Sequence, residues 1–131
     1  MDKEKIDDDL TFRVIGCAMK VHSTLGNGFK EIFYQKALAI ELRNAGIKFK
    51  SEVEMPVYYE GELLGVRRVD FLVEDIVVLE LKAVSIFEPS HLAQGLNYLV
   101  AYNVDKGLLI NFGGTSLDVK RLRHPRNKTR Y

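Results

Sequence analysis

The segment VRRVDFLVEDIVVLELK (residues 66–82) consists of two apolar runs separated by a short acidic pair. Residues 66–73 and 76–81 each have the length and the Val, Ile, Leu and Phe content of a β-strand. The Glu-Asp pair at residues 74–75 is short and polar enough to form the turn between them. We therefore predict a β-hairpin, around which the remaining elements are arranged.

Polar side chains interrupt this hairpin at a spacing that brings them together. Asp70 lies inside the first strand, and Glu80 and Lys82 lie at the end of the second. Since side chains alternate along a strand, Glu80 and Lys82 share one face, Leu81 packs on the other, and Asp70 can face Glu80. Two acids buried together need a compensating cation, so the pattern favours a divalent-metal site. The alternative is a solvated cross-strand ion-pair network.

Length and charge are those of one soluble globular domain spanning residues 1–131. The formal net charge is only +1, but residues 1–9 form an acidic segment and residues 123–131 a basic tail. The basic tail could meet phosphates, or it could be a solubilising chain end.

Cysteine usage and hydropathy indicate the compartment. Cys17 is the only cysteine, so no internal disulfide or cysteine-rich zinc site can form, which favours a reducing cytoplasm. Cys17 itself lies in an apolar stripe and is expected in the core. No apolar run approaches membrane-spanning length and the acidic start is unlike a secretory signal, so we expect a cytoplasmic protein without membrane contact.

Apolar periodicity and turn residues predict the other elements. Helices are expected at residues 10–25, 29–44 and 91–102, and further strands at residues 47–59, 107–112 and 117–122. Pro56 makes its strand an edge strand or gives it a bulge. The expected fold is α/β, with order ααβββαββ, a mixed central sheet flanked by helices, and residues 108–110 in the central strand.

The segment GFKEIFY (residues 28–34) has the form G-x-x-E-x-x-Y on the second predicted helix. With Asp70, residues 80–82, the Gln94 and Tyr98 pair, and LINFG at residues 109–113, the chain resembles the GxxExxY family of the PD-(D/E)XK nuclease superfamily. The position before Asp70 is a valine, although the superfamily name writes proline there. The resemblance implies a restriction-endonuclease-like core, in agreement with the predicted order.

The resemblance also implies a metal-dependent reaction at the predicted hairpin. Asp70 and Glu80 would bind Mg2+ or Mn2+ with the backbone carbonyl of Leu81, and the metal would lower the pKa of a bound water. Lys82 would hold or help deprotonate that water and offset charge on the phosphate.

The resemblance implies further site residues on the predicted helices at residues 29–44 and 91–102. Glu31 would supply a third, water-mediated metal contact and belong to the catalytic set, although an acid is also favourable at a helix N-terminus. Tyr34 would orient Glu31 or a phosphate, or would simply be buried. Because a glutamine and a tyrosine of this spacing line the cleft in related helicase-associated nucleases, the resemblance implies that Gln94 contacts Lys82, the water or the substrate. Tyr98 and His91 share its helical face as substrate-binding residues, with an exposed histidine as the alternative for His91.

Some polar and aromatic residues remain outside this set. Arg67 and Arg68 point to opposite faces, so at most one could bind phosphate in the cleft. Phe87, Tyr102 and Tyr58 are expected to pack in the core or at its rim rather than to stack on bases.

These features lead to a metal-dependent nuclease acting on DNA or RNA, with nucleic acid as partner and a homodimer extending its small surface. One alternative is a nuclease fold retained as a non-catalytic binding or regulatory module. The other is a structural oligomer in which the charged cluster is an ion-pair network.

Overall fold

The computed structural model describes the backbone of residues 3–125 and the side chains from residue 9 onward. Most charges of the acidic segment and of the basic tail therefore lie outside the described residues. The elements follow the predicted order ααβββαββ: α1 (Lys3–Leu25), α2 (Glu31–Asn44), β1 (Phe49–Tyr59), β2 (Glu62–Val73), β3 (Val77–Lys82), α3 (Pro89–Tyr102), β4 (Lys106–Asn111) and β5 (Asp118–Arg123).

The strands form one five-stranded mixed sheet in the order β1-β2-β3-β4-β5. β3 and β4 are parallel, while the other neighbours are antiparallel. A parallel pair needs a long crossover, and here α3 supplies it. β4 is an interior strand as predicted, but the middle position belongs to β3, the strand that carries Glu80 and Lys82.

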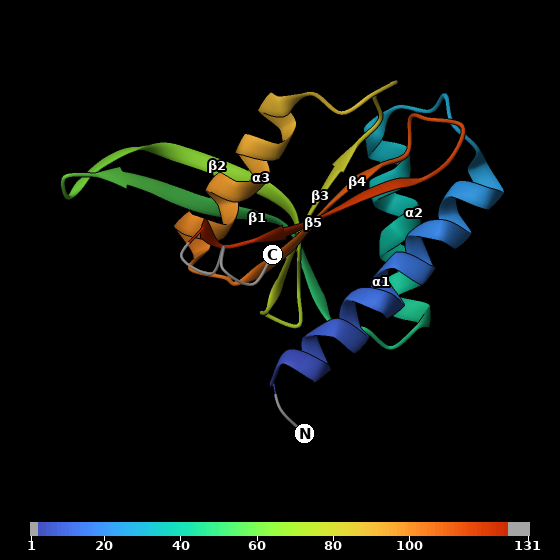
Figure 1. The fold of residues 1–131 in the computed structure, drawn as a ribbon, viewed down its shortest axis with the longest axis horizontal. Coiled ribbons are helices and arrows are strands. Elements are labelled where there is room, and N and C mark those ends of the chain that lie inside the picture. Colours follow the sequence, from blue (N-terminus) through green and yellow to red (C-terminus); the bar gives the residue numbers. More distant parts are fainter. Residues whose placement is uncertain (1–2, 126–131) are drawn as a thin grey trace.

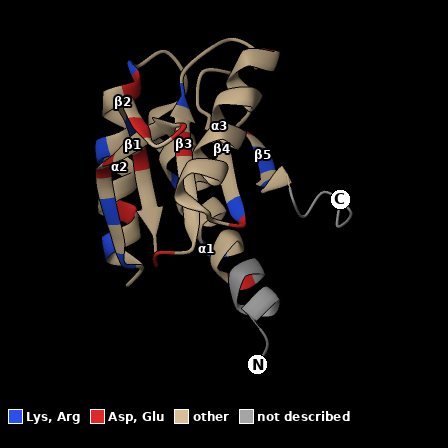
Figure 2. Ribbon diagram, turned by 90° about the vertical axis from the view of Figure 1, so that its left-hand side faces the viewer, with Lys and Arg blue, Asp and Glu red and all other residues tan. Residues whose placement is uncertain are grey.

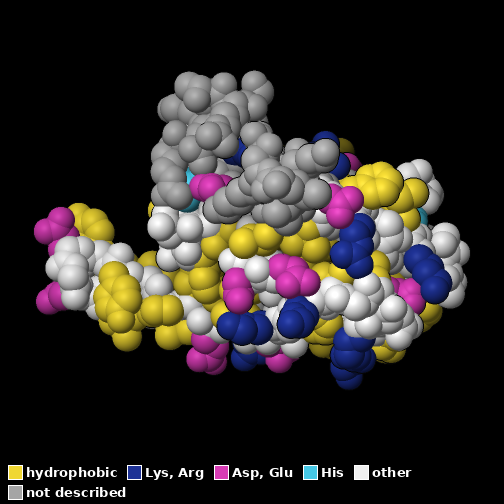
Figure 3. Space-filling view, turned by 90° about the horizontal axis from the view of Figure 1, so that it is seen from below, with side chains coloured by type: hydrophobic (Ala, Val, Ile, Leu, Met, Phe, Trp, Pro, Cys, Tyr) yellow, Lys and Arg dark blue, Asp and Glu magenta, His cyan; other side chains and the backbone are white. Residues whose placement is uncertain are grey.

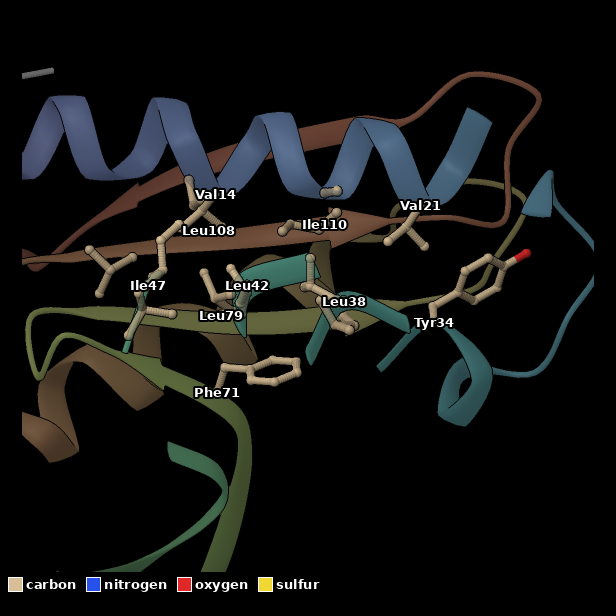
Figure 4. Packing of buried hydrophobic residues seen from close by; sticks show 14 of the residues in the cluster. Val14, Val21, Tyr34, Leu38, Leu42, Ile47, Phe71, Leu79, Leu108 and Ile110 are labelled. Atoms are coloured by element: carbon tan, nitrogen blue, oxygen red, sulfur yellow. The ribbon is translucent and has the colours of Figure 1, made fainter. Parts of the chain in front are cut away.

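Helices cover both faces of the sheet. Figure 1 shows α1 and α2 together on one side and α3 on the other. Tyr34, Leu38 and Leu42 of α2 recur every four residues and are fully buried, so they form one apolar stripe against the sheet. They pack with Val14 and Val21 of α1 in the core of Figure 4. A smaller cluster lies beneath α3.

The hairpin of β1 and β2 is longer than predicted, because β2 begins at Glu62 rather than at residue 66. We call its outer part, residues 54–68, the arm; it projects from the body of the molecule in Figure 1. β1 is an edge strand, and its register with β2 shifts between Val57 and Tyr58, one residue after Pro56. Both predicted ways of accommodating Pro56 therefore occur together.

α1 is also longer than predicted, since it begins at Lys3. The apolar stripe that predicted it starts only at Leu10, which is the first buried residue of the described side chains. Periodicity thus marks the part of a helix that packs, not its full length.

Acidic and basic positions are interspersed over the ribbon, as Figure 2 shows. Within the described residues, no helix has the length and apolar character needed to span a bilayer. Cys17 is partly buried and packs against the main core, with its thiol near the carbonyl oxygen of Glu41 at 3.7 Å.

Candidate active site

Asp70 and Glu80 lie at the point where the pairing of β2 with β3 ends. The last paired residues are Phe71 and Leu79, so Asp70 and Glu80 are the next positions along the two strands. The backbone N–H of Leu81 donates to Oδ2 of Asp70 at 2.7 Å. The Asp70 carboxylate thus takes the place of a backbone acceptor and is held against β3.

β2 changes its orientation at Asp70. Phe71 packs in the core beneath α1 and α2, whereas Val69 packs in the cluster beneath α3. Regular alternation would put these two residues on the same face. Opposite Asp70 in β1, Glu52 has a positive φ of 53°. This irregularity directs the Asp70 carboxylate out of the regular pleat and toward Glu80.

Glu80 is a deeply buried carboxyl group. It is 6% exposed, and its Oε1 has no hydrogen-bond partner among the described residues. The pKa of Glu80 is raised to about 8, first by burial and then by the neighbouring Asp70, although Lys82 and the Tyr98 hydroxyl lower it. Burial likewise raises the pKa of Asp70, against the hydrogen bond from Leu81. Without a cation the pair therefore holds a proton near neutral pH.

The pair has the chemistry of a divalent-cation site. In residues 9–125, no three His, Cys, Asp or Glu side chains gather closely enough to hold a metal by themselves. Mg2+, however, is commonly bound by one or two carboxylates and completed by waters. Two adjacent carboxyls, one with an unpartnered buried oxygen, fit such an ion, since its charge would offset the repulsion that raises the Glu80 pKa.

Glu31 reaches the same neighbourhood from α2, of which it is the first residue. Burial raises its pKa; Lys82 and His91 lower it and Asp70 raises it. Lys82, Asp70 and His91 therefore all lie within electrostatic range of Glu31, although the four residues come from four different elements, α2, β3, β2 and α3.

His91 is oriented by the start of α3. Its Nδ1 accepts the backbone N–H of Glu88 at 3.0 Å, and the Glu88 side chain caps the backbone of His91 in return. Since Nδ1 is the acceptor, the neutral ring carries its proton on Nε2. The Phe87 ring lies edge-on to His91 at 6.3 Å between centroids.

Gln94 and Tyr98 lie one turn apart on α3, as predicted. Gln94 is partly buried, and Tyr98 is buried with its hydroxyl accepting a hydrogen bond from Nη2 of Arg67 at 3.2 Å. The Arg67 guanidinium also stacks on the Tyr98 ring, 4.7 Å from its centroid. The pKa of Tyr98 is raised to about 12, first by burial and then by the nearby Glu80, although Arg67 lowers it.

Tyr34 has a different environment from the other motif residues. It is fully buried and stacks on Phe112 at 4.7 Å between centroids. Its hydroxyl donates to the carbonyl of Gly26 at 2.6 Å and accepts the N–H of Phe29 at 3.2 Å. Of the two alternatives given for Tyr34, the buried one matches this geometry, because the hydroxyl closes the loop before α2.

Sequence reasoning did not assign a role to Asn111, which fixes the end of β3. Its side chain accepts the N–H groups of Val84 and Gly113, both at 3.0 Å, and donates to the carbonyl of Val84 at 2.8 Å. Asn111 pairs with Lys82 across the parallel strands, so it anchors the chain two residues after Lys82. The sequence signal for this role was the position of Asn111 within the LINFG segment, on which the family resemblance partly rests.

A mixed five-stranded sheet flanked by helices, with acids on adjacent strands β2 and β3, defines a restriction-endonuclease-like fold. Residues 8–122 match the model of the PD-(D/E)XK nuclease superfamily. The chain therefore belongs to this superfamily, as its sequence predicted.

One solved structure, SSO0001, has a similar fold, with a TM-score of 0.58 at 18% sequence identity. The similarity covers 75% of this chain and 52% of that one, so this chain corresponds to about half of SSO0001. No match was found among curated proteins.

Proposed function

We propose that the protein is a metal-dependent nuclease that hydrolyses phosphodiester bonds of DNA or RNA. The observation that carries the proposal is the buried pair Asp70 and Glu80, with its unpartnered oxygen and with Lys82 within electrostatic range. A protein can keep the fold of an enzyme family without its activity. A buried acid pair that costs stability is nevertheless a typical feature of a functional site.

Mg2+ or Mn2+ is the proposed cofactor, held by Asp70, Glu80 and the backbone carbonyl of Leu81. Glu31 would add a contact through water, since no third acidic side chain joins the pair directly in the described residues. The chemistry that the ion supplies when bound is activation of water and neutralisation of phosphate charge.

The remaining groups act on the water and the phosphate. The Lys82 ammonium lies within range of all three carboxyls, so it can hold the attacking water and offset charge developing on the phosphate oxygens. Gln94 would contact the water or the phosphate. His91, with its proton on Nε2, would donate to a phosphate oxygen, and Tyr98 would position Glu80 from below.

We also propose membership of the GxxExxY family within the superfamily. In that motif Gly28 adopts a φ of 107°, Glu31 lies at the site and Tyr34 closes the loop before the helix. The motif thus combines one site residue with two residues that position it.

The direct test is cleavage of labelled single- and double-stranded DNA and RNA in Mg2+ and in Mn2+. Glu80→Ala and Lys82→Ala should each abolish cleavage while circular dichroism shows a folded chain. Asp75→Asn and Lys50→Ala, which alter an exposed pair 3.4 Å apart at the edge of the sheet, are the matched controls and should cleave normally. Cleavage that persists in Glu80→Ala would refute the proposed site.

A non-catalytic binding module is the second candidate. The observation in its favour is that no three metal-binding side chains gather in residues 9–125. It predicts nucleic-acid binding that is unchanged by EDTA and no cleavage with either metal.

The proposed assembly is a homodimer, because so small a domain has little surface with which to hold a nucleic acid. Sedimentation at working concentration should give the dimer mass, and a monomer mass would refute it.

A further inference from the structure

A groove of about 480 Å³ runs between the arm and α3. Its walls come from β1, from Arg67 of β2 and from the second half of α3. The lining residues are Met55, Pro56, Val57, Tyr58, Arg67, Asn97, Val100 and Ala101. This lining is mainly apolar and contains a single charged side chain.

Among the described residues, the Arg67 guanidinium has no acidic partner. Its contacts are with Tyr98, as a hydrogen bond and as a stack, and no carboxylate of the described residues pairs with it. The neighbouring Arg68, by contrast, pairs with Glu52 at 3.8 Å and does not line the groove. Arg67 therefore keeps free N–H donors at the groove, in a planar arrangement that suits a phosphate.

Tyr58 places an aromatic ring in the same groove. Tyr58 is the last of four consecutive β1 residues that line the groove, and the register of β1 with β2 shifts between Val57 and Tyr58. From the sequence we expect Tyr58 in the core or at its rim. Tyr58 is 62% exposed, so it is not part of the core. Its neighbour Tyr59 is 66% exposed but does not line the groove.

The apolar surface of the arm is visible in Figure 3, where hydrophobic side chains gather along it and acidic ones lie at its end. Glu60 and Glu62 lie at the turn between β1 and β2, and neither lines the groove. The arm thus presents Tyr58 and Arg67 to the groove without an acid among the lining residues.

One residue, Tyr98, contacts both a residue of the groove and a residue of the proposed active site. Arg67 contacts the Tyr98 hydroxyl, and this hydroxyl interacts with Glu80. Asn97 precedes Tyr98 on α3 and lines the groove. Tyr98 therefore connects the groove to Glu80 by direct contacts on both sides.

We propose that this groove binds single-stranded nucleic acid beside the phosphate that is cleaved, with Arg67 on a backbone phosphate and Tyr58 stacked on a base. The inference rests on the proposed nuclease function and narrows its substrate. The faces of bases inside a duplex are covered by their neighbours, so a base that stacks on Tyr58 must be unpaired. Stacking and a phosphate contact together are how proteins hold single strands.

Fluorescence anisotropy tests the groove without cleavage. The wild-type protein and its variants are titrated in EDTA with labelled single-stranded DNA, single-stranded RNA and a duplex, over a range of salt concentrations. Tyr58→Ala should weaken single-strand binding by about tenfold or more, whereas Tyr59→Ala should leave it within about twofold. Tyr59 is the matched control because it is equally exposed and adjacent.

The arginine variants test the phosphate contact. Arg67→Gln should weaken binding and reduce the slope of log K against log salt by about one, while Arg67→Lys should keep the slope. Arg68→Gln is the control, and its slope should fall less than that of Arg67→Gln. Thermal melts of each variant verify that it is folded.

Several results would overturn the proposal. The first is that the protein does not bind single strands, and the second is that Tyr58→Ala and Tyr59→Ala weaken binding equally. The third is that Tyr58→Ala weakens duplex binding as much as single-strand binding. The fourth is that Tyr58→Ala changes the dimer mass in sedimentation but not the affinity for single strands. The binding and cleavage assays distinguish failure of the groove proposal from failure of the proposed nuclease function. Tyr58-dependent binding without metal-dependent cleavage supports the groove and refutes the nuclease, and cleavage indifferent to Tyr58 does the reverse.

Discussion

Replacing Glu80 by glutamine should stabilise the metal-free protein. The folded state raises the pKa of Glu80 from its ordinary value of 4.5 to about 8, so between these values folding takes up a proton. Stability must then fall as pH rises through this interval, because the unfolded chain binds fewer protons than the folded one. Below about pH 4.5 both states hold the proton, and this contribution to the pH dependence disappears.

The size of the effect follows from the same interval. At pH 7.5 the group lies about three pH units above its ordinary pKa, and each unit is worth about 1.4 kcal/mol, which gives about 4 kcal/mol. Glu80→Gln keeps the shape, cannot ionise, and can donate from its amide to Asp70. We therefore expect Glu80→Gln to be more stable than wild type by about 2–4 kcal/mol at pH 7.5 and nearly equal to it at pH 4.5.

Urea unfolding followed by circular dichroism in EDTA, from pH 4.5 to 8.5, measures this difference. Asp75→Asn is the control, since the side chain of Asp75 is 72% exposed and its removal should leave the pH profile unchanged. Adding Mg2+ should stabilise wild type more than Glu80→Gln. A variant that is less stable than wild type at pH 7.5, or that keeps the wild-type pH slope, would refute the reasoning about the buried pair.

Three further changes test other parts of the site. Gly113→Ala should destabilise the fold by about 1–3 kcal/mol in thermal unfolding, because its Cβ would lie 2.4 Å from the backbone nitrogen and oxygen of Val84. Tyr34→Phe should cost about 1–3 kcal/mol in urea unfolding, since it leaves the partly buried carbonyl of Gly26 without its donor. Gln94→Ala should slow cleavage by about a hundredfold with little change in melting temperature, because a partly buried amide is removed from the water or the phosphate; an unchanged rate would remove Gln94 from the catalytic set.

The sequence predicted the fold well where local patterning and packing agree. The hairpin that carries Asp70 and Glu80 followed from two apolar runs and a polar turn, and the stripe of α2 followed from its period. Residues 62–65 of β2 were not predicted as strand, because Leu63 and Leu64 are exposed and give no buried alternation. Exposed strand residues follow the pairing of their neighbours rather than a hydrophobic pattern of their own.

The site was predicted in its residue types but not in its geometry. The altered orientation of β2 at Asp70 is accompanied by a positive φ at Glu52 in the opposite strand, which has no motif of its own. Arg67 and Arg68 are equivalent in sequence, and only the packing of α3 distinguishes the one that meets Tyr98. Contacts of this kind link residues about thirty positions apart, beyond the reach of periodicity.

The sheet topology has a consequence for the order in which the protein folds. Asp70 and Glu80 are brought together by a hairpin of local contacts, which form early in folding, whereas the parallel pairing of β3 with β4 must wait for the long crossover through α3. While α3 is undocked, the two carboxylates are open to water and can both be charged. Their repulsion becomes costly only when Tyr98 and its helix close over Glu80. We therefore expect the acid pair to act mainly on the rate at which α3 detaches, so that Glu80→Gln slows unfolding more than it speeds folding.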